Sequence, residues 1–409
     1  MADAHISQPE IAPLVEDVEK AGADFHAAKD GDIHTARRNL QHATRKLLQS
    51  LEEPNGEVWP RSFQVNVSAA VEVISQLELW EKFEGGKAVA LDGMVESTKA
   101  DKIVLSEYIQ TSYRIPGTYS LLVRVFRQLT AANIFTESAG PNFTITPLGK
   151  PYLHPDHRAF SNFMFYDLIP AIMAMPRTLE EHQYKAPSKE TGTPFKWAHG
   201  EELWTWLGSH PDRAANMVAG MRSHAPLNAY PWAIELEKMG SKAEDIAVVD
   251  VAGGKGHTME EVRERNPNIK GRFIVQDLSS TFKAMSAPPV GIELMTYDIF
   301  TPQPVKNALI YHYRHIIHNW SDGDCITFLG QIVPLLREQL RSKLLLVDVV
   351  LPDMNSTMQQ AIMDVSMFPM GGMERTESQW KELLAKVGLS IEKIWRGSEP
   401  EACVECRLL

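Results

Sequence analysis

The chain has 409 residues and a formal net charge of -11 at pH 7, with 44% hydrophobic and 23% charged residues. This length predicts two or three domains with a large core, and the composition is typical of a globular protein. The acidic balance argues against a protein that coats nucleic acid, because Lys and Arg supply most of the affinity for phosphate. We find neither a run of about 18 uncharged apolar residues nor a signal-peptide pattern, so we expect a cytoplasmic protein without membrane contact.

Residues 10–110 have helical periodicity and little strand character. The next segment predicts two helices, broken at the sequence IPG, and then a short hairpin that ends at TITPLG. Helix, turn, helix and hairpin together indicate a winged helix. Arg124 and Arg127 on its second helix are placed as in a DNA-binding protein, but the apolar spacing of LLVRVFRQL favours packing, so we expect no nucleic-acid partner. We expect this mainly helical domain to span residues 1–185.

Strands alternate with helices beyond residue 185, which predicts an α/β domain over residues 186–409 with a doubly wound, Rossmann-like, mostly parallel sheet. The strands are expected at IAVVDVA, GRFIVQDL, ELMTYDIF, ALIYHY and SKLLLVDVVLP, with a last strand near Ala402. Cys403 and Cys406 in that last strand form a C-x-x-C. Their side chains should point to opposite faces, which disfavours a shared metal or redox site.

A glycine-rich turn follows the first strand of this domain. Asp250 lies near the strand end, Gly253, Gly254 and Gly256 form the turn, and a helix follows. The Thr-x-x-Glu spacing from Thr258 predicts a capping box at the start of that helix. Ligands bind at this place in doubly wound sheets, because glycines let the main chain approach closely and free N–H groups favour polar or anionic partners.

The spacing excludes two familiar nucleotide-binding loops. A dinucleotide fingerprint would need glycine where Met259 stands, and a P-loop would need Ser or Thr where Gly256 follows Lys255. Asp277 lies about twenty residues beyond the loop, where an acid accepts hydrogen bonds from ribose hydroxyls. This pattern resembles the S-adenosylmethionine (SAM) loop of the class I methyltransferases, with a plain structural turn as the alternative for the glycines alone.

The sequence YHYRHIIHNWSDGDC ends a later strand, so His318 falls at the carboxyl edge of the sheet. His318-Asn319-Trp320 resembles the His-Asp-Trp motif of fungal and plant small-molecule O-methyltransferases. Asp348 and Glu374 match two further carboxylates of that family. The resemblance extends over nearly the whole chain, and it implies a winged-helix dimerisation domain, a SAM-binding domain and a homodimer.

The resemblance also implies roles for individual residues. His318 would be the general base, with Asp348 and Glu374 fixing its tautomer and stabilising the imidazolium. A phenol with a pKa near 10 is only about one part in a thousand phenolate at pH 7, so a hydroxyl acceptor needs such a base. The residues implied to bind SAM are Asp250, Gly253, Gly254, Gly256, Asp277, Leu278, Asp298, Ile299, Phe300 and Tyr313.

Four positions depart from the family pattern. Ala252 stands for the usual first glycine, Asn319 for the aspartate after the histidine, Met373 for a lysine and Asp348 for a longer glutamate. Asp348 is one methylene shorter than glutamate, so its carboxylate reaches less far toward His318.

Three histidines, His312, His315 and His318, recur at intervals of three, a spacing found among metal ligands. Their segment passes from strand into turn, so the side chains need not share a face. We therefore expect no metal.

Two segments rich in methionine and aromatic residues, FSNFMFYDLIPAIMAMP and AIMDVSMFPMGGM, are candidates for an apolar substrate pocket. Ordinary core packing is the alternative for each residue. The pocket would suit an aromatic or polyketide-type secondary metabolite. The candidate pocket residues are His154, His157, Phe165, Met173, Arg314, Met363, Met367, Met370 and Met373.

A second activity stays open on the same fold. Some fungal proteins that resemble O-methyltransferases retain SAM but catalyse pericyclic reactions, with the sulfonium as a fixed positive charge. Such an enzyme needs hydrogen-bond donors, which His154, His157, Arg314 and His315 would supply. Two of the departures, Asn319 and Met373, fit that activity. The retained His318 and its two carboxylates favour methyl transfer, which is the activity that we expect.

Overall fold

The computed structural model describes residues 8–29, 33–52, 54–98, 117–139, 141–187, 191–223, 230–283, 285, 287–397 and 401–409. The chain forms two compact units, Met1–Leu153 and His154–Leu409. The units divide earlier than the boundary expected at residue 185. The reason is that two early helices, which the expected boundary assigns to the first domain, pack within the second unit: α8 on α12 and α9 on α10.

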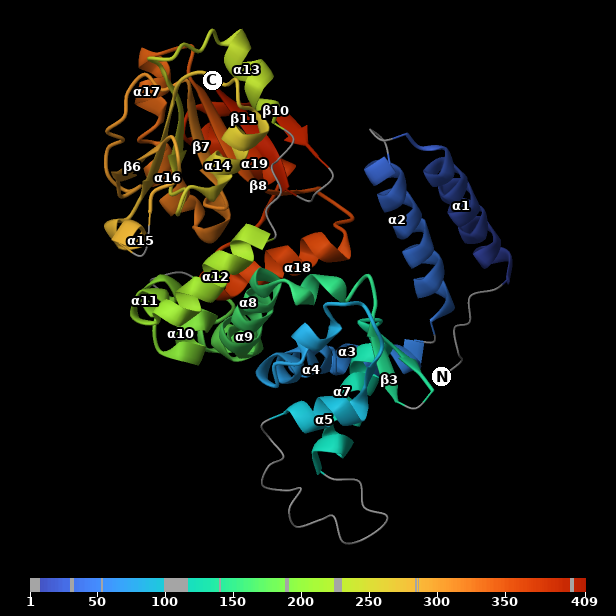
Figure 1. Ribbon diagram of the computed structural model, residues 1–409. Coiled ribbons are helices and arrows are strands. Elements are labelled where there is room, and N and C mark those ends of the chain that lie inside the picture. The colour runs from blue at the N-terminus through green and yellow to red at the C-terminus, as the bar shows by residue number, and fades with distance from the viewer. Residues whose placement is uncertain are drawn as a thin grey trace. The chain divides into compact units, whose positions relative to one another are not determined.

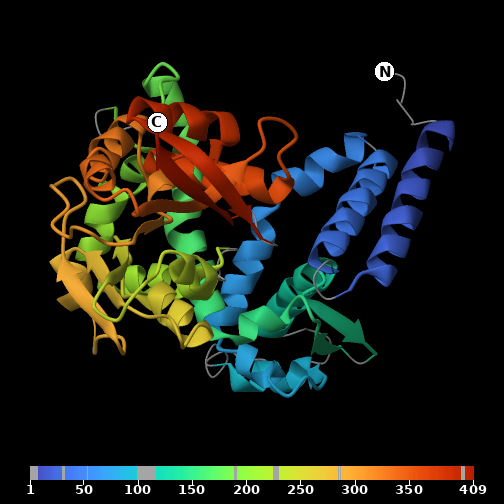
Figure 2. The ribbon, with the colours of Figure 1, turned by 90° about the horizontal axis from the view of Figure 1, so that it is seen from above.

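The first unit is mainly helical. Helices α1 (Gln8–Ala27) and α2 (Ile33–Leu51) lie side by side in both views (Figure 1, Figure 2). The other elements are α3 (Pro54–Ser62), α4 (Val65–Gln76), η1 (Trp80–Phe83), β1 (Val89–Ala90), α5 (Leu91–Ser97), α7 (Gly117–Ala131), β2 (Phe135–Ser138), β3 (Asn142–Ile145) and η3 (Lys150–Leu153).

An aromatic cluster forms the core of this unit. Phe126 of α7 lies against Phe135 of β2 and Phe143 of β3, with ring centroids 5.0 and 4.4 Å away. Arg124 and Arg127 are exposed on the same helix, so α7 turns its apolar residues to the core. The second helix and the hairpin of the expected winged helix are present, whereas its first helix falls outside the described residues.

The second unit begins with helices, drawn in green in Figure 1. They are α8 (Pro155–Phe163), the π-helix η4 (Met164–Leu168), α9 (Ile169–Glu181), α10 (Pro194–His199), α11 (Leu203–Ser209) and α12 (Pro211–Ser223). Asp167 of η4 is buried and accepts hydrogen bonds from Arg213 Nε at 2.9 Å and Trp206 Nε1 at 3.3 Å. A buried carboxylate needs a charged partner, and this ion pair joins the π-helix η4 to α12.

An eight-stranded sheet follows within the described residues. Its strands are β4 (Ile246–Val251), β5 (Arg272–Asp277), β6 (Ile292–Thr296), β7 (Ile310–Arg314), β8 (Lys343–Leu351), β9 (Arg375–Thr376), β10 (Leu389–Arg396) and β11 (Glu401–Leu408). Its helices and turns are α13 (Trp232–Lys238), α14 (His257–Arg265), α15 (Ser279–Lys283), η5 (Ile317–Asn319), α16 (Asp322–Leu329), α17 (Val333–Glu338), α18 (Met358–Met367), η6 (Phe368–Met370) and α19 (Glu377–Lys386). Among the described helices, none combines the length and the hydropathy that crossing a membrane requires.

The strand order β10-β11-β8-β7-β4-β5-β6 confirms the doubly wound sheet. Strands β4 to β8 pair in parallel and β9 pairs in parallel with β8, whereas β11 is antiparallel to both β8 and β10. The chain proceeds outward from β4 to β6 and returns to β7 on the other side of β4. Ligands bind outside the carboxyl ends of the strands at such a reversal. The loops after Val251 and Arg314 begin there.

Alternation along the strands produces two apolar faces. Val249 and Tyr313 belong to a core formed with α16, α17 and α19, whereas Val248 and Leu345 belong to a core formed with α13 and α14. Successive residues of a strand point to opposite faces, so strands covered on both sides are apolar nearly throughout. This is why the central strands were recognisable as short apolar runs.

Of the last two strands, β10 was not predicted from the sequence and β11 was. The strand prediction omitted β10, whose residues are mostly partly or fully exposed and so lack an apolar run. The strand near Ala402 is confirmed as β11. Its Cys403 and Cys406 are buried in the two opposite cores, as the strand geometry predicts.

We expect Leu346→Ala to lower the free energy of unfolding by about 2–5 kcal/mol, because Leu346 is fully buried in β8 and truncation leaves a cavity. Leu340→Ala is the matched control. Leu340 is 82% exposed, so its truncation should change the free energy by less than about 0.5 kcal/mol. Urea denaturation followed by circular dichroism measures both changes. Equal effects would contradict the placement of β8 in the core.

Candidate active site

The glycine turn between β4 and α14 lies at the carboxyl edge of the sheet. Ala252, Gly254 and Gly256 have positive φ angles of 55°, 61° and 86°. Glycine adopts this conformation without strain, whereas Ala252 keeps the same backbone path despite its methyl group. Gly253 has no room for a side chain, because a Cβ there would collide with the carboxylate of Asp250. The turn therefore presents bare main chain.

Helix α14 begins at His257, with Gly256 as its N-cap and no side-chain cap. The capping box expected from Thr258 is therefore wrong. The Thr258 hydroxyl instead accepts a hydrogen bond from Arg314 Nη1 at 3.2 Å, which ties α14 to β7. The start of α14 therefore carries no side-chain cap beside the turn, and the N-terminus of a helix favours anionic groups.

Asp277, at the end of β5, lies beside this turn. Its Oδ2 accepts the Gly254 N–H at 2.9 Å, and its Oδ1 accepts the Leu278 N–H at 2.7 Å and the Thr281 hydroxyl at 2.6 Å. A carboxylate offers about four acceptor positions, so Oδ2 keeps one for a further hydroxyl. The three donors fix the orientation in which it is offered.

Asp250 is buried below the turn and is paired with His312, which the sequence did not assign to the site. The two residues lie opposite each other on the parallel strands β4 and β7, with His312 Nδ1 2.7 Å from Asp250 Oδ1. Among the described residues, Asp250 Oδ2 and His312 Nε2 have no hydrogen-bond partner. The ring of Trp232 packs edge-on against the His312 ring, with centroids 5.3 Å apart.

His318 lies in η5, just beyond β7, and meets both carboxylates that the sequence assigned to it. Its Nδ1 is 2.8 Å from Glu374 Oε1 and 3.6 Å from Asp348 Oδ1. Its main-chain N–H donates to Asp348 Oδ2 at 3.3 Å. The other ring nitrogen, Nε2, has no hydrogen-bond partner among the described residues.

The charges of this cluster are coupled. Burial opposes an imidazolium, but Asp348 and Glu374 outweigh that effect and raise the pKa of His318 to about 9. Burial raises the pKa of Asp348 to about 7, against the attraction of the His318 charge. The His318 ring is therefore protonated on both nitrogens at neutral pH.

Close backbone contacts hold the His318 turn. The Met373 N–H donates to the His318 carbonyl at 2.8 Å, and a Cβ at Gly372 would collide with the same carbonyl. The Asn319 side chain donates to the His315 carbonyl at 2.7 Å. Asn319 and Met373 both depart from the family pattern. Asn319 stabilises the turn through its side chain and Met373 through its main chain.

Arg375 is a buried residue beside the candidate site that the sequence did not assign. Its guanidinium donates to the carbonyls of Ile317 and Trp320, both at 3.0 Å, and to Asp322 Oδ1 at 2.9 Å. It therefore ties η5 to the start of α16 from the strand β9. A lone arginine outside any periodic pattern gave no signal beyond its place directly after Glu374.

A second imidazole lies beside His318. The His315 ring is 5.5 Å from the His318 ring and inclined by 19°, and its Nε2 is 2.8 Å from Glu401 Oε2. The backbone of His315 has a φ of 54°, which turns the chain away from β7. Burial lowers the pKa of His315, despite the hydrogen bond to Glu401, so this ring stays neutral. Glu401 is distant in sequence and was missed.

Arg314, a candidate pocket residue, is engaged by the same carboxylate. Its Nε and Nη2 donate to Glu401 Oε2 at 3.1 and 2.9 Å. His315 and Arg314 together hold the pKa of Glu401 below its ordinary value, although burial opposes this. The guanidinium is thus directed at Glu401 and Thr258.

The remaining candidate SAM residues lie at the same edge of the sheet. Asp298 Oδ1 accepts the Phe300 N–H at 3.0 Å in the loop after β6, with Ile299 and Phe300 partly buried. Leu278 is 54% exposed beyond β5. Tyr313 is fully buried in β7, and its hydroxyl has no partner among the described residues.

The candidate pocket residues differ in exposure and in their contacts. Met370 packs against an apolar cluster that includes Phe163 and Phe195, which joins the two methionine-rich segments. His154 caps α8 and is exposed, and Met173 is 72% exposed. The others apart from Arg314 are partly buried, namely His157, Phe165, Met363, Met367 and Met373.

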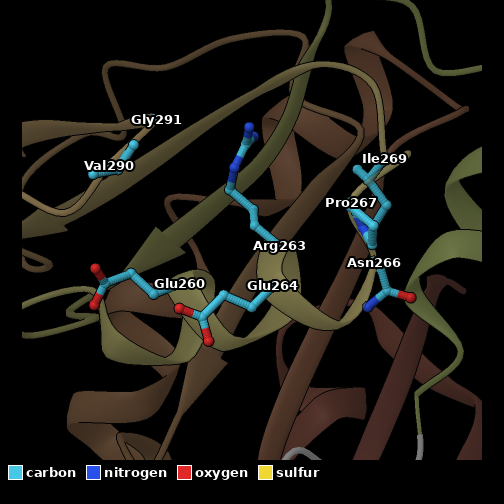
Figure 3. A pocket seen from close by; sticks show the side chains of 8 residues that line it. All are labelled: Glu260, Arg263, Glu264, Asn266, Pro267, Ile269, Val290 and Gly291. Carbon is cyan, nitrogen blue, oxygen red and sulfur yellow. The ribbon is translucent and has the colours of Figure 1, made fainter.

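A hollow of about 380 Å³ lies at the opposite, amino edge of the sheet (Figure 3). It is lined by the end of α14 and the segments that enter β5 and β6, and it contains none of the candidate residues. It is therefore separate from the reversal of strand order. Within the described part of the chain, no three His, Cys, Asp or Glu side chains are placed to hold a metal ion.

We expect the His318 imidazole to titrate near pH 9 in the free protein, since two carboxylates favour its charged form. Glu374→Gln should lower the midpoint toward the ordinary value, because it removes one charge and an ionic hydrogen bond. Proton NMR of the ring signals, assigned by comparison with His318→Gln, measures the midpoint. A midpoint near 6.5 in the unsubstituted protein would contradict the arrangement.

The fold matches that of solved structures. The structure of LepI in complex with SAM superposes with a TM-score of 0.80, at 24% sequence identity, over 98% of this chain and 100% of that chain. At this identity the likeness establishes the fold and no more.

Sequence comparison establishes the family. Residues 181–390 match the family model of the O-methyltransferase domain. The O-methyltransferase afvC of Aspergillus flavus is 30% identical over 373 residues, which cover 88% of this chain and 85% of afvC. Demethylsterigmatocystin 6-O-methyltransferase of the same fungus is 29% identical over 339 residues, 81% of this chain and 86% of that protein. SAM is the methyl donor of this family, which confirms the expected cofactor at family level. The chain belongs to the O-methyltransferase family.

Proposed function

We propose that the protein transfers the methyl group of SAM to a hydroxyl of an apolar aromatic or polyketide-type secondary metabolite, with His318 as the general base. The observation that carries the proposal is the position of His318. It lies at the carboxyl edge of the sheet, one strand from the glycine turn, with Nδ1 held by Glu374 at 2.8 Å and Nε2 left for a substrate.

The residues at the turn fit SAM. Asp250 Oδ2 is a buried carboxylate oxygen without a partner, which suits the cationic ammonium of the amino-acid end. Asp277 keeps an acceptor position for a ribose hydroxyl, and the bare backbone of Gly253 and Gly254 allows close approach. When bound, SAM supplies an electrophilic methyl group on a sulfonium.

His318 can accept the hydroxyl proton only when its ring is neutral. Glu374 holds the proton of Nδ1, so the lone pair lies on Nε2, and the imidazolium formed is stabilised by both carboxylates. With a pKa of about 9, roughly 1% of the rings are neutral at pH 7. A nearby positive charge lowers the pKa of an imidazole, so a sulfonium beside the ring increases this fraction.

The substrate class is supported by two observations. A relative at 29% identity is named for demethylsterigmatocystin. The segment that leads into Glu374 carries partly buried methionines, of which Met370 joins the apolar helical cluster. Methionine adapts to irregular apolar shapes, as a polycyclic acceptor requires.

A pericyclic activity is the second candidate, and one observation favours it. His318 is cationic at neutral pH, and a cationic imidazole donates hydrogen bonds instead of accepting protons. The fold is also shared with a protein described as a pericyclic reaction enzyme, at a TM-score of 0.80 and 24% identity. Arg314 argues against it, because Glu401 and Thr258 already accept from this guanidinium. We therefore place methyl transfer first.

We also propose a cytoplasmic homodimer without a nucleic-acid partner. The three cysteines are free and buried, in keeping with a reducing compartment. Trp59 and Phe63 in and beside α3 are 71% and 48% exposed, which favours a further protein surface over them.

Incubation with methyl-labelled SAM and a panel of hydroxylated aromatic polyketides, demethylsterigmatocystin included, tests the reaction. We expect label in the product and one S-adenosylhomocysteine for each methyl transferred. His318→Gln should lower kcat at least about 100-fold, the usual contribution of a general base. His42→Gln, on exposed α2, is the control and should leave kcat unchanged. A cyclised or isomerised product with an unchanged methyl count would establish the pericyclic activity instead.

The pH dependence separates the two activities. For methyl transfer we expect kcat/KM to rise about tenfold per pH unit from about pH 7 and to level off near 9, because only the neutral ring accepts the proton. His318→Gln should react at least about 100-fold more slowly, and its rate should level off only near pH 10, where the phenol itself ionises. A rate that falls as pH rises through 9 would mean that His318 acts as a hydrogen-bond donor.

A further inference from the structure

Asp250 and His312 form a buried pair behind the glycine turn, and the proposed function gives a role to Asp250 alone. We propose that His312 is a positioning residue of the cofactor site, which holds the Asp250 carboxylate oriented toward the ammonium of the SAM amino-acid end. The inference rests on the proposed SAM site and extends it to a side chain that never touches the cofactor.

The parallel register sets the geometry of the pair. Asp250 on β4 lies opposite His312 on β7, so both side chains leave the same face of the sheet. His312 Nδ1 is 2.7 Å from Asp250 Oδ1, which occupies one carboxylate oxygen. The other oxygen, Oδ2, lies against Gly253, where a Cβ would collide with it. The pair therefore determines which oxygen faces the turn.

Burial makes the donor necessary. Asp250 is 1% exposed and His312 is fully buried. A buried carboxylate oxygen without a hydrogen-bond donor is left unsatisfied, which costs free energy. His312 Nε2 has no partner among the described residues, so the satisfied tautomer carries its proton on Nδ1 and donates it to Asp250. Trp232 against the ring maintains this orientation.

The test compares ligands with and without the amino-acid end. Calorimetry measures the affinity of the full chain for SAM, for S-adenosylhomocysteine and for 5′-methylthioadenosine, which lacks that end. We expect His312→Leu to weaken SAM and S-adenosylhomocysteine about tenfold or more, the scale of a hydrogen bond to a charged group. The affinity for 5′-methylthioadenosine should change by less than about twofold, since the nucleoside half does not meet Asp250.

Matched variants separate positioning from packing. His312→Asn places an amide N–H near the position of Nδ1 and should restore most of the affinity. His312→Gln carries its amide one bond further out and should behave like His312→Leu, which keeps the test available if the leucine variant does not fold. Asp250→Asn should reproduce the selective loss, and combining it with His312→Leu should add little, because the two residues act as one unit.

The outcomes are distinct. Selective loss for ligands with the amino-acid end supports the proposal. Equal loss of affinity for all three ligands overturns the proposal, because His312 would then contribute only to the fold. No loss for any ligand also overturns it, because His312 would then have no effect on binding. Failure of the unsubstituted protein to bind SAM or S-adenosylhomocysteine would overturn the proposed function itself. This outcome is distinct from any result obtained with the variants alone.

Discussion

The candidate site at the carboxyl edge of the sheet depends on two buried carboxylates that share one imidazole. Asp348 and Glu374 are both withdrawn from water, and charges buried in this way are tolerated only with a cationic or donating partner. His318 supplies that partner through Nδ1 and through its main-chain N–H. The pairing of β9 with β8, where Arg375 lies opposite Val350, brings Glu374 to the same edge as Asp348. The raised pKa of His318 follows from this arrangement.

The three histidines spaced by three residues explain how one short segment serves several tasks. His312 still belongs to β7 and faces Asp250, His315 turns out of the strand with a positive φ and meets Glu401, and His318 lies in the following turn with Glu374. Each therefore has its own carboxylate. A spacing that resembles a metal motif produces separate ionic hydrogen bonds, because the backbone changes direction between the rings.

The two stacked imidazoles have opposite protonation at neutral pH. Burial keeps His315 neutral, while the carboxylates around His318 favour its cation. Pairs of titratable groups whose pKa values are driven apart mark the acid and base roles of a site. Here the difference arises from the number of carboxylates, since Arg314 shares Glu401 with His315 and reduces the charge available to it. Methyl transfer and pericyclic chemistry differ in which state of His318 they use.

The sequence by itself determined the central strands of the sheet and the edge on which the candidate site lies. Apolar runs located β4, β5, β7 and β8, the glycine turn located the ligand end of β4, and the family motifs located His318, Asp348 and Glu374, because all of these are local patterns. Only the tertiary structure decided the partners of these groups. His312 meets Asp250, Glu401 meets His315 and Arg375 holds η5 through contacts between strands far apart in sequence. The capping box expected at Thr258 is wrong because α14 already begins at His257, with Gly256 as its N-cap, and the Thr258 hydroxyl accepts from Arg314 instead. Local periodicity encodes which face a residue occupies, whereas long-range pairing decides which charge it finds there.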